Sequence, residues 1–464
     1  MDTNRVLIVG GGIAGLSAAY RLSAAVPTPE IVLVESSNRL GGKLVTDYVG
    51  GCVVEGGADS FLASKPQATD LCRELGIDTD LVGTRPEKRG SYVMKDGELH
   101  PIPEGLTGLV PSRLEPLLAS NLFTAAGKRR IAAEPSRPAR TTDEDESLLS
   151  FIDRRFGREA YDRLIEPLMA GIYAGDGSQL SVRAAFPQLQ QMEQTAGSVV
   201  AALNSAPRPV QPRSGFLTPR QGLAFLVRSL RAHLHGTSVL QGRSAQSVMR
   251  RVGGYSVSLD GGSRLDARAV VLATPVHVSA SLLESAMPEL AAPLHAIPAV
   301  SSAIVALSYR DLDIPNPVEG YGYVVPRHEG RPVLACTWVS NKFPDRAPPG
   351  VSLIRVFLGR AGQQDMTNLS DADLVQVARD ELQDVTGTTH SPLFTRVFRW
   401  PKAMPQYTLG HRERISAVEQ TLQSETGLFL AGNAYAGVGI PDCIRSGERA
   451  ADGALRVLAL PRPI

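Results

Sequence analysis

The sequence predicts an α/β fold in which a doubly wound parallel sheet is assembled from separate stretches of the chain, beside an α+β domain and a helical insertion. The first observation is a glycine-rich turn at 10–15 between the apolar strand 6–9 and an Ala/Leu-rich helix. The second is that further short strands of this kind return only after residue 237. The third is a long helical pattern between about 86 and 210.

The N-terminal turn has the residue types that a bound dinucleotide requires. Gly10 permits the tight turn, Gly12 lets the backbone approach a pyrophosphate, and Gly15 allows the helix to pack closely on the strand. The N–H groups at the helix N-terminus then face the phosphates. Glu35 ends the next strand and is placed to accept hydrogen bonds from a ribose hydroxyl, so this segment predicts a Rossmann-like domain.

A second glycine pair, Gly41-Gly42, follows this acidic residue and is flanked by Arg39 and Lys43. The glycines allow close backbone passage beside a cofactor, and the two cations can neutralise pyrophosphate charge. Only one GxGxxG motif in the chain stands between a strand and a helix. A second nucleotide fold for a nicotinamide is therefore not expected, and oxygen is the expected electron acceptor.

The predicted sheet divides the chain into three parts. The discontinuous Rossmann-like domain is expected from 1–85, 214–285 and 406–464, because its strands return late in the sequence. The helical insertion is expected at 86–213 and the α+β domain at 286–405.

Local patterns add finer predictions. The apolar run 267–273 predicts one strand that ends at Thr274-Pro275, and the last helix is expected over about 444–458. Apolar residues in 109–123 and in 148–156 predict two amphipathic helices. The Pro-rich, charged link 134–146 between them predicts a mobile loop.

Composition excludes several classes of function. The 464 residues carry 48 basic and 47 acidic side chains, a net charge of +1, so bulk charge does not favour nucleic-acid binding. The four cysteines lack CxxC spacing, which argues against a zinc site or a disulfide framework and favours a reducing cytoplasm. No signal peptide and no spanning helix are expected.

Several segments resemble the oxygen-dependent protoporphyrinogen IX/coproporphyrinogen III oxidases of the flavin amine-oxidase superfamily. They are, with the second glycine pair, the segments 55–62 (EGGADSFL), 171–176 (GIYAGD), 400–411 and 432–444 (GNAYAGVGIPDCI). Ala58 stands where this family usually has proline. Together the segments span nearly the whole chain.

The resemblance implies FAD as the cofactor and no metal. It assigns no catalytic side chain, because flavin N5 carries the hydride chemistry. The residues that it places at the cofactor are Gly10, Gly12, Ile13, Ala14, Gly15, Glu35, Ser36, Arg39, Gly41, Gly42, Lys43, Gly57, Ala58, Asp59, Ser60, Val248, Trp400, Gly432, Val438, Gly439 and Ile440.

The activity implied by the resemblance is the six-electron oxidation of coproporphyrinogen III to coproporphyrin III in haem biosynthesis, with oxygen consumed and hydrogen peroxide released. Oxidation of protoporphyrinogen IX to protoporphyrin IX is the alternative. The two substrates differ by two propionates in place of vinyls, so cations in the pocket would decide between them.

Four residues are candidates for the substrate site by resemblance: Lys65, Tyr173, Ala174 and Gly175. An ammonium group at Lys65 suits flexible propionates, although a solvated surface lysine explains the same residue equally well. Tyr173 either packs on the macrocycle or fills the core.

The expected partners are a porphyrinogen, molecular oxygen and, transiently, a ferrochelatase. The expected location is the cytoplasm or, peripherally, the inner face of the membrane. An apolar helix at 109–123 followed by Lys128-Arg129-Arg130 fits an interfacial helix, but a core-facing helix with a cationic end is the favoured interpretation. Membrane contact is therefore expected to be weak.

Two other classes of function share the same glycine motifs. An amine oxidase or carotenoid-type desaturase would share the stretch from Gly10 to Gly42, but is not expected to have 171–176 together with 437–443. A non-catalytic carrier, like the Rab escort and GDP-dissociation inhibitor proteins, would lack bound flavin.

Overall fold

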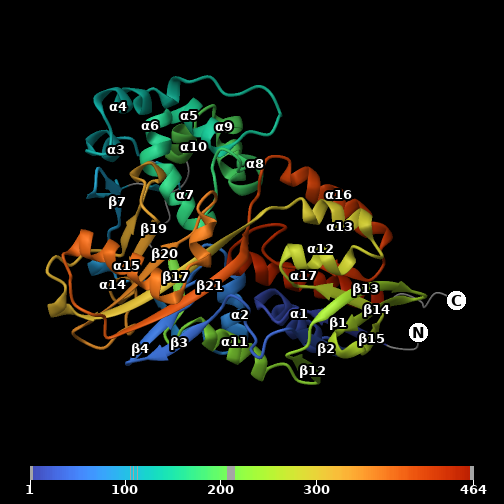
Figure 1. Ribbon diagram of the computed structural model, residues 1–464. Helices are drawn as coiled ribbons and strands as arrows, with labels where there is room; N and C mark the ends of the chain where they lie inside the picture. Colours follow the sequence, from blue (N-terminus) through green and yellow to red (C-terminus); the bar gives the residue numbers. More distant parts are fainter. Residues whose placement is uncertain (1–3, 105, 108, 112, 206–214, 460–464) are drawn as a thin grey trace.

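The computed structural model describes residues 4–104, 106, 107, 109–111, 113–205 and 215–459, so the expected boundary at 213/214 lies outside the described residues. Three parts are visible in Figure 1: a sheet with helices at the lower right, a larger sheet at the left, and a helical part at the top.

A five-stranded parallel sheet has the order β12-β2-β1-β16-β22. Its strands come from three distant stretches of the sequence, as a discontinuous doubly wound domain requires. They are β1 (Arg5–Val9), β2 (Glu30–Glu35), β12 (Thr237–Gln241), β16 (Ala269–Leu272) and β22 (Leu428–Leu430). Val6 to Val9 are all buried, because both faces of the sheet are covered.

Alternate residues of β1 contact different layers. Val6 and Ile8 belong to a core with α1 (Ile13–Ser23), α2 (Pro66–Glu74), α11 (Leu223–Ala232) and α17 (Ile440–Ala459). Leu7 and Val9 belong to the core on the other face, which contains the antiparallel strands β13 (Ala245–Arg251), β14 (Gly254–Leu259) and β15 (Arg264–Ala267) and the helices α12 (Val276–Leu283), α13 (Pro288–His295) and α16 (His411–Ser424). The two faces thus have separate hydrophobic cores.

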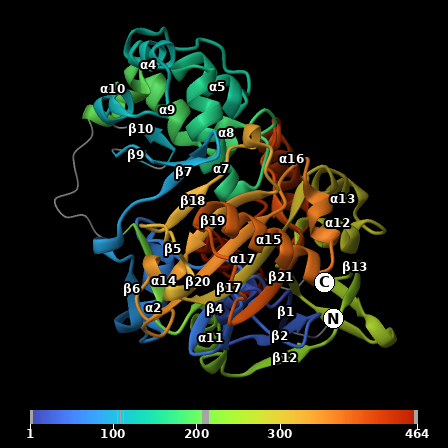
Figure 2. The ribbon, with the colours of Figure 1, turned by 60° about the vertical axis from the view of Figure 1, so that its left-hand side comes forward.

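The second sheet has seven strands in the order β21-β17-β20-β19-β18-β7-β8. The strands are β7 (Tyr92–Lys95), β8 (Glu98–Pro101), β17 (Ala299–Arg310), β18 (Gly322–Val324), β19 (Val333–Trp338), β20 (Val351–Leu358) and β21 (Phe394–Pro405), with α14 (Val339–Lys342) and α15 (Asp371–Thr386) packed nearby. Residues 92–101, expected in the helical insertion, instead extend this sheet: β7 pairs in parallel with β18 (Figure 2). Val93 and Met94 are fully buried there.

The helical part follows β8. It contains the short strands β9 (Leu106–Thr107) and β10 (Val110–Pro111) and the helices α3 (Glu115–Ala119), α4 (Ala125–Ala132), α5 (Leu148–Phe156), α6 (Arg158–Ala160), α7 (Glu166–Tyr173), α8 (Val182–Ala185), α9 (Pro187–Ala196) and α10 (Val199–Ser205), with a π-helical turn at Tyr161–Ile165. The helix predicted at 148–156 is confirmed as α5.

Smaller elements connect these parts. β3 (Thr46–Val49) and β4 (Cys52–Glu55) form a hairpin, and β5 (Phe61–Leu62), β11 (Phe216–Pro219) and β6 (Leu81–Gly83) form a three-stranded sheet. The hairpin leads directly into residues 55–60, which contact strands β20 and β21 of the second sheet.

Four local predictions were wrong. Residues 109–123 do not form one helix, because Pro111 belongs to the short strand β10 and the helix α3 spans only Glu115–Ala119. The run 267–273 is split at Arg268, where the chain leaves the antiparallel sheet and enters the parallel one. The last helix begins at Ile440, because Pro441 is tolerated in a first helical turn. The link 134–146 is anchored, since Glu134 is fully buried.

Candidate functional site

Two glycines of the first turn are required by the fold itself. Gly10 has a φ of +106°, and a Cβ there would lie 2.7 Å from the carbonyl oxygen of Ala273. A Cβ on Gly15 would lie 1.9 Å from the carbonyl oxygen of Gly10. Neither position can take a larger side chain without moving backbone, which explains the close contact of α1 with β1.

Gly12 has the opposite surroundings. A Cβ at this position would meet nothing nearer than the Cα of Gly42, at 4.0 Å. Gly12 is also the N-cap of α1 and supplies no side-chain cap, so the first N–H groups of the helix, at Ile13, Ala14 and Gly15, lack a side-chain partner. Open space beside uncapped donors is the environment that an anionic group such as a pyrophosphate fits.

Glu35 closes β2 beside this turn. One oxygen accepts a hydrogen bond from the Gly11 N–H at 2.7 Å, and the other accepts from the N–H and the hydroxyl of Ser37, both at 2.8 Å. Ser36 lies next to it, with its hydroxyl 3.4 Å from the same carboxylate. These bonds fix the carboxylate and leave lone pairs for hydroxyl donors of a ligand.

The second glycine turn is held against the first. The Gly41 N–H donates to Gly11 O at 2.8 Å, and the guanidinium of Arg39 donates to Gly42 O at 2.6 Å. Lys43 points elsewhere, since its ammonium group donates to the carbonyl oxygen of Ala403 at the end of β21. Burial lowers the pKa of Lys43 to about 8, so the amine has lost much of its hydration there.

Residues 55–60 are anchored by cations from the seven-stranded sheet and its surroundings. The carboxylate of Glu55 is fully buried, 3.4 Å from the equally buried guanidinium of Arg346. It also accepts from the Leu223 N–H at 2.8 Å and the Thr46 hydroxyl at 2.9 Å. Burial raises the pKa of Glu55 to about 7, against the opposing effect of Arg346.

Asp59 has two cationic partners. Lys342 lies 2.9 Å and Arg355 3.4 Å from its carboxylate, and Ser60 donates to it at 2.6 Å. Burial alone would raise the pKa of Asp59, but these two cations outweigh it and lower the pKa well below its usual range. Ala58, beside it, is exposed.

Two side chains of the second sheet fix the glycines of this segment. Trp400 donates from its indole N–H to Gly56 O at 2.7 Å, and Arg355 donates to Gly57 O. A Cβ on Gly57 would lie 2.1 Å from the carbonyl oxygen of Lys43. The segment 55–60, Lys43 and the end of β21 therefore form one connected region.

The C-terminal loop joins the same region. Asn433 donates to Ala403 O at 3.4 Å, and the Gly432 N–H donates to the Ser446 hydroxyl at 3.1 Å. A Cβ on Gly432 would meet nothing within 4 Å. Further along, the Gly439 N–H donates to Asp442 at 3.3 Å, Val438 packs against the core of the helical part, and Ile440 begins α17.

The candidate substrate residues have different environments. The ammonium of Lys65 lies 2.6 Å from the buried carboxylate of Asp442, and the lysine side chain is 40% exposed, so Lys65 is a paired cation with a partly accessible side chain. Tyr173 is buried, with its ring edge-on to Phe186 and Tyr407, and thus fills the core.

Ala174 and Gly175 end α7. Ala174 is left-handed, with a φ of +49°, and its carbonyl oxygen accepts from the Ala361 N–H at 2.8 Å. A Cβ on Gly175 would lie 2.3 Å from the side-chain oxygen of Gln406. This tight turn contacts both the second sheet and the C-terminal stretch.

The structure brings most of the predicted cofactor residues together, and Val248 is joined to them through the hydrophobic core on one face of the parallel sheet. The glycine turns, Lys43, residues 57–60, Trp400 and the loop 432–440 are linked by the contacts above. Val248 lies in β13 and is fully buried in the core that contains Val9 and Val34, on the opposite face of the parallel sheet from α1.

Sequence reasoning missed the anchoring cations Lys342, Arg346 and Arg355. Arg355 gave a signal, because a charged residue interrupts the apolar strand Val351–Leu358. Buried arginines are rare unless paired, so such a residue predicts an ion pair. Lys342 and Arg346 lie in a polar stretch, where no pattern distinguishes them from surface residues.

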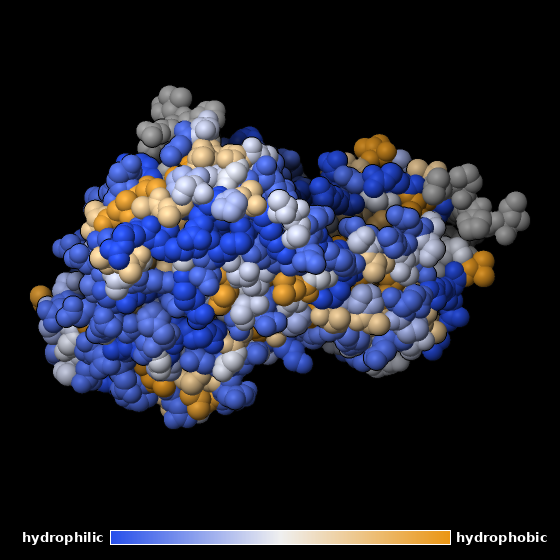
Figure 3. Space-filling view, turned by 90° about the horizontal axis from the view of Figure 1, so that it is seen from above, coloured by the Kyte–Doolittle hydropathy of each residue, from blue (hydrophilic) through white to orange (hydrophobic). Residues whose placement is uncertain are grey.

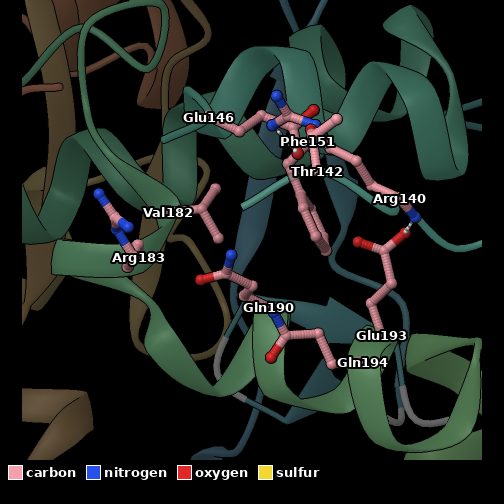
Figure 4. Close-up of a pocket in the computed structure, with 9 residues that line it drawn as sticks. All are labelled: Arg140, Thr142, Glu146, Phe151, Val182, Arg183, Gln190, Glu193 and Gln194. Atoms are coloured by element: carbon pink, nitrogen blue, oxygen red, sulfur yellow. Dashed lines mark hydrogen bonds and ion pairs between the residues drawn. The ribbon is translucent and has the colours of Figure 1, made fainter. Parts of the chain in front are cut away.

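A small pocket in the helical part has room for about one water molecule. Figure 4 shows its charged lining, in which the Arg140 N–H donates to Glu193 at 3.3 Å. Arg154 pairs with both Glu146 and Glu193, at 2.9 and 2.5 Å. Arg154 in α5 thus forms ion pairs with Glu146 of the link 134–146 and with Glu193 of α9, so these interactions hold the link against the helices. Among the described residues, no group of His, Cys, Asp or Glu could hold a metal ion.

Comparisons with known proteins agree along the chain. Residues 13–455 match the model of the flavin containing amine oxidoreductase family. A coproporphyrinogen III oxidase of Bacillus subtilis (strain 168) is 36% identical to this chain, and the match covers 98% of this chain and 98% of that protein. A protoporphyrinogen oxidase of Homo sapiens is 35% identical, and the match covers 96% of this chain and 97% of that protein.

A crystal structure from Exiguobacterium sp. 255-15, of a protein provisionally named protoporphyrinogen oxidase, superposes with a TM-score of 0.87 at 32% identity, covering 98% of this chain and all of that one. These matches identify an oxidoreductase with a flavin cofactor. The chain belongs to the flavin-containing amine oxidoreductases and, within them, to the family of coproporphyrinogen III and protoporphyrinogen oxidases.

Proposed function

We propose that this protein uses FAD and molecular oxygen to oxidise coproporphyrinogen III to coproporphyrin III, a step of haem biosynthesis. The observation that carries the proposal is the connected region around Gly12, Lys43 and residues 57–60, in a chain that matches a coproporphyrinogen III oxidase over 98% of both lengths. Six electrons leave the substrate, so three molecules of oxygen are reduced to three of hydrogen peroxide.

The residues present fit a flavin dinucleotide. The open side of Gly12 and the uncapped N-terminus of α1 suit the pyrophosphate, and the fixed carboxylate of Glu35 suits a ribose. Lys43 and the loop 432–440 would then lie toward the ring system. When bound, the flavin supplies the two-electron acceptor for the substrate and the donor for oxygen.

The chain's own contribution is to orient the substrate and to exclude water. Lys65 offers a partly exposed ammonium to a propionate while it stays bonded to Asp442. The exposed side chains of Leu62 and Phe216, paired across β5 and β11, offer apolar surface near it, since the Lys65 N–H donates to the carbonyl oxygen of Leu62 at 3.4 Å. We propose Lys65 and the turn at 173–175 as parts of the substrate site.

The function is tested by porphyrin fluorescence in air with purified protein whose flavin has been extracted and identified by chromatography. Coproporphyrinogen III and protoporphyrinogen IX are supplied separately. We expect FAD and a higher kcat/KM with coproporphyrinogen. A preference for protoporphyrinogen would instead support the alternative, which the human relative favours at 35% identity. Bound flavin without oxidation of either substrate above the enzyme-free rate would reject both.

The substitution Lys65→Gln tests whether Lys65 binds a propionate of the substrate or only pairs with Asp442. If it receives a propionate, the KM for coproporphyrinogen should rise about tenfold, with a smaller rise for protoporphyrinogen, which has two propionates fewer. Lys88→Gln, at an exposed position, is the control. Equal KM values for Lys65→Gln and the wild type would reject a substrate role.

The remaining partners are part of the same proposal. We infer a cytoplasmic enzyme that passes its product to a ferrochelatase and touches the membrane weakly if at all.

No helix in the described residues is long and apolar enough to cross a bilayer. Figure 3, viewed from above the helical part, shows hydrophobic residues in small groups among hydrophilic ones. Arg130, one of the cations that an interfacial helix would present to lipid, donates to three carbonyl groups near the end of α5.

A further inference from the structure

The hydroxyl group of Tyr407 closes a ring of hydrogen bonds across the C-terminal loop. It donates to the carbonyl oxygen of Asn433 at 2.7 Å and accepts from the N–H of Gly437 at 2.8 Å. One side-chain atom therefore spans the turn 433–437. Gly437 has a φ of +133°, and its N–H has this hydroxyl as partner.

The ring of Tyr407 is held on two sides. It stacks on His411, with ring centroids 4.1 Å apart and an interplanar angle of 11°, and it meets Tyr173 edge-on at 6.0 Å. Only 2% of the residue is exposed. Such packing leaves the hydroxyl little freedom to move away from the loop.

The residue before Tyr407 is bonded to the turn 173–175, the proposed part of the substrate site. Gln406 donates from its side chain to Tyr173 O at 2.8 Å, where α7 ends. The carbonyl oxygen of Tyr407 accepts from the Ser181 N–H at 2.8 Å. The stretch 406–407 thus contacts the turn 173–175 on one side and the loop 433–437 on the other.

We propose that Tyr407 is a positioning residue that fixes the loop 432–440 relative to the turn 173–175. The proposal rests on the proposed function, in which the loop 432–440 faces the flavin and the turn 173–175 faces the substrate. It gives a role to a residue of the segment 400–411 that the assigned cofactor and substrate contacts do not use.

Tyr407→Phe tests this proposal, because it removes both hydrogen bonds and keeps the ring. Hydrogen exchange of peptides from 432–440 is measured on the holoenzyme, and the dissociation constant of FAD is measured by fluorescence quenching. We expect exchange in this loop to become about tenfold faster and FAD to bind about tenfold more weakly, as two lost hydrogen bonds imply. Peptides from other parts of the chain should be unchanged.

Tyr323→Phe is the matched control. It also removes a buried tyrosine hydroxyl, which donates to Glu381 at 2.9 Å in the seven-stranded sheet. This variant should lose thermal stability without faster exchange at 432–440. If the two variants show the same loop exchange and the same FAD affinity, Tyr407 is only a packing residue and the proposal is wrong.

Turnover gives a third readout. With the porphyrinogen that the wild type oxidises, Tyr407→Phe at saturating FAD should lower kcat several-fold with KM changed less than twofold, because the loop and not the substrate contact is disturbed. Exchange and FAD binding need no porphyrinogen. If the wild type oxidises none, the proposed function fails, while those two measurements still decide the role of Tyr407.

Discussion

Lys65 and Asp442 form an ion pair of 2.6 Å in which the lysine side chain is 40% exposed and the carboxylate 2% exposed. The two partners differ in what else they contact. Asp442 also accepts from Arg445 at 2.8 Å and from the Gly439 N–H at 3.3 Å. The pair therefore links the segment before α2 to the first turn of α17 and to the loop that precedes it.

This asymmetry predicts unequal effects of removing each partner. Lys65→Gln should lower the free energy of unfolding by less than about 1 kcal/mol, because Asp442 keeps its two other donors. Asp442→Asn should cost about 3 kcal/mol, because it weakens all three interactions and leaves two cations without their counter-charge. Urea titrations followed by fluorescence measure both. Equal losses would show that the pair itself, and not the buried carboxylate, is the stabilising unit.

Gly12 and Gly15 make a matched pair for separating fold from cofactor binding. Gly12→Ala should leave the unfolding free energy of the flavin-free protein within about 0.5 kcal/mol of the wild type, because a Cβ there meets only Gly42 Cα, at 4.0 Å. It should weaken FAD binding at least about tenfold, because the methyl group occupies the space left for the pyrophosphate.

Gly15→Ala should behave in the opposite way. Its Cβ would lie 1.9 Å from Gly10 O, so α1 must move and the flavin-free protein should lose about 3 kcal/mol or more. Thermal unfolding and FAD titration are measured on both variants. Full FAD affinity in Gly12→Ala would show that the cofactor does not approach this backbone.

The parallel sheet and its glycine turns were predictable because each rests on local sequence. Four consecutive apolar residues, a turn that needs glycine, and a helix lie within the first 23 residues. The same holds for α5, whose apolar residues recur at helical spacing. The positions of these elements follow from the order of apolar and glycine residues within short stretches of the sequence.

The anchoring of residues 55–60 could not be predicted in this way. Glu55 pairs with Arg346 and Asp59 with Lys342, partners that are 291 and 283 positions apart in the chain. No local pattern selects one arginine or lysine among 48. Strands β7 and β8 were missed for a similar reason, since residues distant in the sequence bury Val93 and Met94. Strand β7 pairs with β18, Val93 belongs to the core of the helical part, and Met94 belongs to the core of the seven-stranded sheet.

Glu134 was misjudged because its surroundings in the sequence are polar and rich in proline. In the structure its carboxylate and the guanidinium of Arg155 are both fully buried and bonded to each other. The carboxylate also accepts from the Ser198 hydroxyl at 2.6 Å and the Val199 N–H at 3.0 Å. A loop with such an anchor is fixed at one end.

Glu134→Ala should therefore destabilise the helical part by about 3 kcal/mol, because it removes a buried ion pair and leaves Arg155 only the more distant carboxylate of Glu193, at 3.3 Å. Arg158→Ala, which removes an exposed pair with Asp162, should cost less than about 1 kcal/mol. Limited proteolysis should cut Glu134→Ala within 134–146 and spare the control. Similar resistance of the two variants would mean that the link is held by its other contacts.

His411 predicts a defined pH dependence of stability. The residue is 2% exposed and stacked on Tyr407, and burial, with a further contribution from Arg414, lowers its pKa to about 4. The unfolded chain, with a pKa near 6.5, binds the proton more readily, so the contribution to stability is complete above about pH 6.5 and is lost as the pH falls toward 4. The loss should reach about 3 kcal/mol.

The substitution His411→Phe keeps a stacked ring and removes the titrating group. Urea unfolding of both proteins between pH 4 and 8 should show a wild-type stability that falls faster on acidification, with the two curves parallel above about pH 7. Glu55 has the opposite effect on the pH dependence of stability. Its pKa is raised to about 7 in the folded protein, so its contribution to stability is present at low pH and is lost as the pH rises toward 7. Since Glu55 is present in both proteins, its contribution cancels in the difference. A difference that does not vary with pH would show that His411 is accessible to protons in the folded state, and that the stack on Tyr407 accommodates the charged ring.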